Sequence, residues 1–243
     1  MRIVKGKQYT PRALFTKVRR EIHAKAPRFI PYAALFGCSD EVNSAADLER
    51  FAAFGTHGGI FTTRIIGSQV FYHQIKVALG TGHKTNVFEV NVHIGEEKDA
   101  RGRVAYGHIT GRDKRRRACC GALTHVLEDF RTHPREKPSV SQHVGGEVYL
   151  DFLGTLKFRL KQYRSEILSA GNPIMAITRR NLDAQVAELA VRLRNDIAEH
   201  PKDGPFFVYG TISYNHTRGA DRLSLEHFLM ITGPGPADVY ALL

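Results

Sequence analysis

The chain has 243 residues, and its 35 lysines and arginines against 24 aspartates and glutamates give a formal net charge of +11. Its 42% hydrophobic and 24% charged residues are ordinary for a globular protein, which excludes a disordered or fibrous chain. No apolar run approaches the ~18 residues of a membrane span, and the first residues hold no apolar secretion signal. Three cysteines make a poor disulfide framework, which favours a reducing compartment. Together these features lead us to expect a cytoplasmic protein with no membrane partner.

The first half of the chain alternates helical and strand patterns. Pro11 after Thr10 is typical of a helix start, and an apolar stripe at helical spacing follows, which predicts an N-terminal helical arm over about 10–25. A buried strand over 32–36, a helix over 45–54 and a second strand over 87–92, ended by Gly95, come next.

The second half begins with a polar stretch over 96–117, which predicts a hairpin-like excursion around Gly102 and Gly107. Helices are expected over 122–130, 150–168 and 178–198, and strands over 206–209 and 228–231. Strands separated by helices favour one α/β domain over 1–243, with a central, mostly parallel sheet flanked by helices.

Soft metal ligands lie next to the ends of the predicted strands. Cys38 follows the first strand, His93 follows the second, and Cys119 and Cys120 precede a helix. Carboxyl ends of parallel strands are where ligands bind in α/β sheets, and a helix N-terminus favours a thiolate. Two thiolates and one imidazole suit a catalytic zinc site with an open fourth position. The alternative is that these cysteines are plain buried hydrophobes.

The strongest basic run, residues 112–117, raises the question of nucleic-acid binding. No helix-turn-helix, RNP-type aromatic pattern or zinc-finger spacing accompanies it. The sequence therefore argues against nucleic acid, and a solvated face or an entry path for an anion is the simpler interpretation.

Several short segments, in the same order along the chain, resemble the limiting-CO₂-inducible (LCIB-type) family of β-carbonic anhydrases. Residues 38–43 resemble its C-x-D-E opening, 54–60 its glycine-rich loop, and 92–95 its P-H-[IV]-G segment. Residues 120–122 match its C-G-A, and 209–215 with Asp221 resemble its closing G-G-I-x-I-N strand. The resemblance implies a β-carbonic-anhydrase-like fold and a homodimer.

Carried over residue by residue, the resemblance makes Cys38, His93 and Cys120 the zinc ligands, with Cys119 as the competing third ligand. Asp40 is then the aspartate that orients the metal-bound water or takes its place. The arginine that usually follows this aspartate by two positions is replaced by Val42. Arg64, expected in a loop near the site, is the candidate replacement, and a plain surface cation is the alternative.

The resemblance implies reversible hydration of CO₂ to bicarbonate by attack of zinc-bound hydroxide. Two thiolates neutralise the ion, so we expect activity to be weak near pH 7 and to climb towards pH 8–9. Arg64→Ala should shift that rise or abolish turnover without loss of zinc, and Arg50→Ala should do neither. The alternatives are a catalytically silent zinc scaffold of the same fold and a basic nucleic-acid-binding protein.

Three histidines in the glycine-rich region are candidate proton carriers: His57, His73 and His83.

Overall fold

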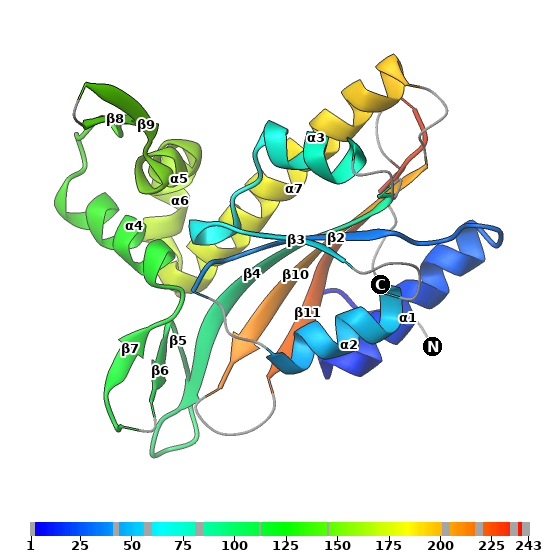
Figure 1. The fold of residues 1–243 in the computed structure, drawn as a ribbon. Coiled ribbons are helices and arrows are strands. Elements are labelled where there is room, and N and C mark those ends of the chain that lie inside the picture. The colour runs from blue at the N-terminus through cyan, green and yellow to red at the C-terminus, as the bar shows by residue number, and fades with distance from the viewer. Residues whose placement is uncertain are drawn as a thin grey trace.

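A computed structural model describes residues 3–40, 44–55, 60–80, 85–111, 113–144, 146–200, 205–216, 221–233 and 238–239. Its centre is a twisted mixed sheet in the order β1-β11-β10-β4-β2-β3 (Figure 1). The strands are β1 (Gln8–Tyr9), β2 (Ala33–Gly37), β3 (Phe61–Arg64), β4 (Val87–Lys98), β10 (Phe206–Asn215) and β11 (Arg222–Ile231). The inner strands β3, β2, β4 and β10 run parallel, and β11 pairs antiparallel with β10. The expected mostly parallel sheet flanked by helices is confirmed.

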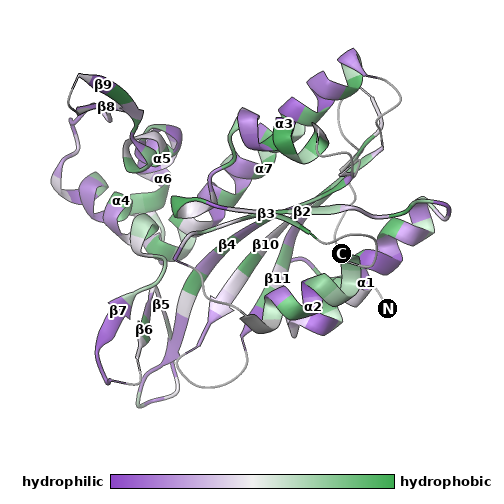
Figure 2. Ribbon diagram, viewed as in Figure 1, coloured by the Kyte–Doolittle hydropathy of each residue, from purple (hydrophilic) through white to green (hydrophobic). Residues whose placement is uncertain are grey.

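Helices cover both faces of this sheet. On one face lie α1 (Pro11–Lys25) and α2 (Ser44–Phe54), and on the other lie α3 (Tyr72–Gly80) and α7 (Pro173–Glu199) (Figure 1). Two apolar clusters fill the spaces between the layers. Figure 2 shows that hydrophobic and hydrophilic segments alternate along the helices and along the strands β4, β10 and β11. Within the described ranges, no helix combines the length and apolar character needed to cross a bilayer.

Local signals start the two longest helices. The first begins where predicted, whereas α7 begins at Pro173, before the predicted start at 178. The Thr10 hydroxyl accepts a hydrogen bond from the Ala13 N–H, with Pro11 in the first turn of α1. The side chain of Asn172 caps α7 in the same way, before Pro173. The apolar stripe of α1 is buried against the sheet and α2 of its own chain. The predicted N-terminal helical arm therefore forms part of one helical layer against the sheet.

A separate lobe follows β4. It contains β5 (Val104–Tyr106), β6 (His108–Thr110), β7 (Arg116–Ala118) and α4 (Gly121–Thr132). The expected hairpin-like excursion is confirmed as two antiparallel hairpins, β4–β5 and β6–β7. The basic run lies on the second hairpin, where Arg117 forms an ion pair with Asp113; Arg112 lies outside the described residues.

Several elements differ from the sequence prediction. β10 extends past the predicted end at 209, and β11 begins before the predicted start at 228. β4 does not end at Gly95, because β10 pairs with it up to that residue and β5 pairs with the three residues that follow. The single helix expected over 150–168 is α5 (Phe152–Leu160), the 3₁₀ turn η2 (Lys161–Tyr163) and α6 (Arg164–Ser169). That segment follows an unpredicted hairpin, β8 (Ser141–Val144) with β9 (Glu147–Leu150). A short strand β12 (Asp238–Val239) pairs with β11, and a 3₁₀ turn η1 (Ile66–Ser68) follows β3.

Candidate metal centre

Cys38 and His93 come from neighbouring parallel strands. Cys38 is the first residue after β2, as predicted, and it is 1% exposed. His93 lies inside β4 and not beyond it, opposite Ser213 of β10. The pairing of β2 with β4 is recorded only as far as Val90, so β4 carries His93 past the end of its shorter neighbour. The two side chains therefore meet at the edge where β2 stops.

Cys120 arrives from the hairpin lobe. It is the N-cap residue of α4, directly after β7 and Cys119. A ring of three backbone hydrogen bonds fixes this point: Gly95 N–H to the Cys119 carbonyl, Gly107 N–H to Gly95, and Cys119 N–H to Gly107, at 2.8, 2.9 and 2.9 Å. The ring joins both hairpins to β4, and it places Cys120 beside the residues at the end of β2.

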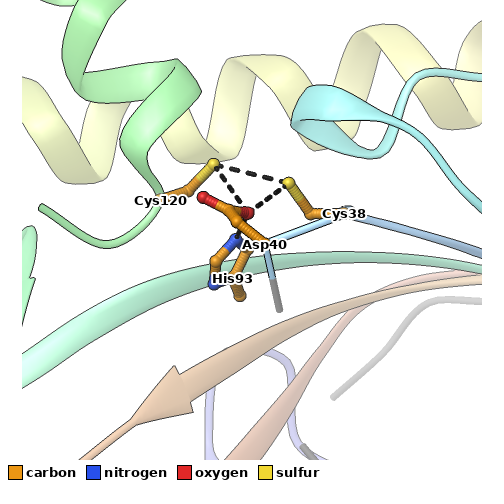
Figure 3. Close-up of side chains that lie close together, drawn as sticks. All are labelled: Cys38, Asp40, His93 and Cys120. Carbon is orange, nitrogen blue, oxygen red and sulfur yellow. Dashed lines mark hydrogen bonds and ion pairs between the residues drawn. The ribbon is translucent and has the colours of Figure 1, made fainter. Parts of the chain in front are cut away.

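Four side chains converge (Figure 3). The sulfurs of Cys38 and Cys120 are 3.6 Å apart, and Asp40 Oδ1 lies 2.6 Å from the Cys38 sulfur and 2.7 Å from His93 Nε2. One ligand atom from each of the four residues lies within 4.8 Å of every other. The structure thus brings together Cys38, Asp40, His93 and Cys120, all of which the sequence singled out.

This donor set fits zinc. Two sulfurs bound to one zinc at about 2.3 Å each lie about 3.8 Å apart in a tetrahedron, close to the separation of the Cys38 and Cys120 sulfurs. Both cysteines and His93 are at most 2% exposed, whereas the side chain of Asp40 is 44% exposed. Three buried ligands with the fourth position on the open side are the arrangement of a catalytic zinc site.

Hydrogen bonds set the charges within the group. The hydrogen bond with Cys120 lowers the pKa of the Cys38 thiol to about 5, against the effect of burial. The same bond and burial raise the pKa of Cys120 well above its ordinary value. Burial opposes ionisation of Asp40, but hydrogen bonds with His93 and Cys38 outweigh it and hold its pKa below its usual range. Burial also opposes protonation of His93, and its hydrogen bond with Asp40 nevertheless raises that pKa. The site therefore favours a thiolate and a carboxylate, both of which bind cations.

A hydrogen bond on the side of the ring opposite Asp40 fixes the orientation of the His93 imidazole. Its Nδ1 lies 3.0 Å from Asn215 Oδ1. An amide oxygen only accepts, so Nδ1 carries the hydrogen and Nε2 is left for a metal. The sulfur of Cys119 also faces Nδ1, at 3.5 Å, on the side of the ring away from the group. Cys120, not Cys119, is therefore placed beside Cys38.

A tight turn holds Cys38. The Gly67 N–H donates to the Cys38 sulfur at 3.1 Å, and its carbonyl accepts a 2.7 Å hydrogen bond from Asn181 of α7. Gly67 has φ +68°, and a Cβ there would meet Leu156 at 2.6 Å. Glycine is required at this position for both reasons. Neither Gly67 nor Asn181 was singled out from the sequence, because their contacts join segments far apart in the chain.

Arg64 lies beside the group, at the end of β3 and not in a loop. Its guanidinium binds the Asp47 carboxylate at 2.8 and 3.0 Å and reaches the Cys38 carbonyl at 3.4 Å. Among the described residues, the hydrogen bonds of Asp40 go instead to His93, both cysteines and the Gly121 N–H. Arg64 therefore contacts the backbone carbonyl of Cys38, one of the predicted zinc ligands, and the carboxylate of Asp47. Val42 lies outside the described residues.

Arg50, the control residue in the sequence-based prediction for Arg64, is buried and paired. It is 3% exposed, and its guanidinium binds Glu89 at 2.5 and 3.1 Å and Asp47 at 2.6 Å. Glu89 lies on β4, is 1% exposed and also accepts hydrogen bonds from Tyr209 and Thr211. A charge network thus runs from buried Glu89 and Arg50 through the partly exposed Asp47 to Arg64.

A cavity of about 330 Å³ opens over the group. Cys38, Asp40 and Gly121 form part of its wall, and apolar side chains line another part: Ile66, Ala122 and Leu153. His125 of α4 also lines it and keeps a side chain that is 59% exposed to solvent. The predicted proton carrier His73 is exposed on α3, away from this lining, and His57 and His83 lie outside the described residues. The sequence carried one signal for His125: it follows Cys120 by five residues in the predicted helix, so it lies little more than one helical turn from a predicted ligand.

No protein-family model and no curated protein sequence matches the chain. Among solved structures, it is similar to PtLCIB4, a homolog of the limiting CO₂-inducible protein LCIB, with a TM-score of 0.71 and 18% identity over 97% of this chain and 95% of that chain. LCIB itself gives a TM-score of 0.66 and 16% identity over 97% and 95%. The resemblance seen in the sequence motifs is therefore matched by the architecture, and this chain has the fold of LCIB and its homolog PtLCIB4.

Proposed function

We propose that the protein holds zinc through Cys38, His93 and Cys120, with Asp40 at the open position, and catalyses the reversible hydration of CO₂. The observation that carries this proposal is that the four-residue group lies at a partly apolar cavity, whose wall includes its members Cys38 and Asp40. CO₂ is small and has no charge, so an apolar wall admits it without loss of hydrogen bonds. Membership of the LCIB-type family is part of the same proposal.

Neighbouring residues orient the proposed zinc ligands and Asp40. Zinc bound there is a Lewis acid that makes water a nucleophile near neutral pH. Asn215 keeps the imidazole of His93 turned towards the ion, and the Gly67 N–H does the same for the Cys38 sulfur. The Gly121 N–H holds Asp40 Oδ2 at 3.0 Å, so this carboxylate stays at the open side and can accept a proton from water.

A stopped-flow CO₂ hydration assay on zinc-loaded protein tests the proposal. We expect weak activity near pH 7 that rises towards pH 8–9. Two thiolates cancel the charge of the ion, so the pKa of water bound to it should lie above the ~7 of a three-histidine site. A silent scaffold of this fold would hold zinc and show no hydration at any pH. A flat profile from pH 6.5 to 9 would contradict the proposed charge effect.

His125 is proposed to carry the proton out of the cavity. Hydration releases one proton per turnover, and His125 is a titratable side chain that reaches from the cavity wall to solvent. We expect His125→Ala to lower kcat several-fold in dilute buffer, with kcat/KM and zinc content unchanged, and added imidazole to restore kcat. His133→Ala is the matched control, since His133 faces the same Asp129 from the next turn but does not line the cavity. Equal rates in the two variants would remove this role from His125.

A homodimer is also proposed. The β8–β9 hairpin and α5 expose much of several large apolar side chains in the described part of the chain: Val148, Tyr149, Leu150, Phe152 and Phe158. Such a patch is typical of a protein interface, and a second copy would cover it. Light scattering at micromolar concentration should give twice the chain mass, and Phe158→Asp should give one chain mass with unchanged zinc content. A monomeric wild-type protein would contradict the proposal.

A further inference from the structure

A second cavity, of about 460 Å³, lies between α1 and the segment that leads into β2. Its lining consists of Thr16, Arg19, Arg20, Ile22, His23, Phe29, Ile30, Pro31 and Phe54. The segment 29–31 precedes β2, whereas Cys38 follows it, so the two cavities lie at opposite ends of this strand (Figure 1). The proposed reaction makes no use of the second cavity.

The apolar part of its wall is fixed before any ligand binds. The Phe29 ring meets Phe207 edge to face at 5.1 Å, and Phe54 is 1% exposed. The side chain of Asn86 accepts from the Tyr32 N–H at 2.8 Å and donates to the Ile30 carbonyl at 3.0 Å, which ties the segment to the sheet. Ile30 nevertheless leaves 51% of its surface exposed. A preorganised apolar wall lowers the ordering cost of binding an apolar group.

The other part of the wall is cationic. Arg19, Arg20 and His23 follow one another along α1 beside buried Ile22, and none of the nine lining residues is acidic. Among the described residues, neither guanidinium has an ion-pair or hydrogen-bond partner. This differs from Arg50, whose guanidinium is already bound to carboxylates of the chain. Two available guanidinium groups beside an apolar wall suit a carboxylate, sulfonate or phosphate.

We propose that this cavity binds an organic anion with an apolar body, with its charged group on Arg19 and Arg20 and its body against Phe29, Ile30 and Phe54. Its volume is that of an ordinary small-molecule site, and the lining combines an apolar wall with a few charged groups that fix orientation. The ligand class is thus an amphipathic carboxylate or a chemically similar anion of medium length.

The test uses 8-anilinonaphthalene-1-sulfonate as a fluorescent probe, with octanoate and octan-1-ol as competitors of the same length. We expect one saturable site, displaced by octanoate at a concentration about tenfold lower than by octan-1-ol, since a charge-assisted hydrogen bond adds that much affinity. Arg19→Glu and Arg20→Glu should each weaken probe binding about tenfold or more for the same reason. Ile30→Asp should weaken it through the apolar wall.

Arg12→Glu is the matched control, because Arg12 is exposed on the same helix and does not line the cavity. Its effect should stay within about twofold at physiological salt, where distant exposed charges are screened. Thermal unfolding of each variant checks that the fold is retained. The proposal is overturned if Arg12→Glu weakens binding as much as Arg20→Glu, if octan-1-ol competes as well as octanoate, or if the probe signal does not saturate.

Discussion

Cys38→Ser and His93→Ala should each abolish zinc binding and CO₂ hydration. Each removes one of three buried ligands, and a buried metal that loses a ligand also loses its contribution to folding. A protein that holds zinc at a concentration a thousand times its Kd gains about 4 kcal/mol of stability from the ion, and this is the expected loss. Elemental analysis and thermal unfolding, with and without a chelator, measure both effects.

Cys119→Ser is the matched control for these variants. The Cys119 sulfur is buried beside His93 Nδ1 and lies outside the group of four, so its removal should leave zinc content near one per chain. In the wild-type protein the chelator should lower the unfolding temperature to that of Cys38→Ser. Full zinc occupancy in Cys38→Ser, with the fold intact, would refute the proposed centre.

Arg50→Ala should destabilise the fold by about 3–5 kcal/mol, because it leaves Glu89 charged and without its cation in the middle of the sheet. Chemical unfolding at pH 7 measures the loss of unfolding free energy. Arg64→Ala is the control: its partner Asp47 is 43% exposed, so the expected cost is below about 1 kcal/mol. The double variant Arg50→Met, Glu89→Gln should recover much of the stability, since the isolated charge is then gone. A loss below about 1 kcal/mol in Arg50→Ala would show that Glu89 is not held by this pair.

The sequence could predict the parts of the fold that depend on local patterns. The helix of 10–25 has a capping residue, a proline and an apolar stripe, and all three act within the segment itself. The strand of His93 is different, because its length depends on β10, which is more than a hundred residues away in the chain. Gly95 looked like a strand end, yet it lies within β4 because it pairs with Asn215 of β10 and the residues after it pair with β5.

The candidate site divides in the same way. Cys38, Asp40, His93 and Cys120 were found because their residue types carry metal chemistry on their own. Which of Cys119 and Cys120 faces the group depends on the backbone conformation at the end of β7, which no spacing reveals. The ion pair of Arg50 with Glu89 was not predicted, because an arginine in a helical pattern is usually solvated and only the packing of α2 against the sheet buries it.

The backbone ring of Gly95, Gly107 and Cys119 gives the protein a natural attachment point for added sequence. The β4–β5 turn at residues 99–103 lies beyond this ring, with exposed side chains and a hydrogen-bonded base at Asp99. A short tag or a labelled residue inserted in that turn leaves the strand register at His93 and the N-cap at Cys120 in place. Gly95 itself offers no such freedom, because an added Cβ would meet the His108 backbone.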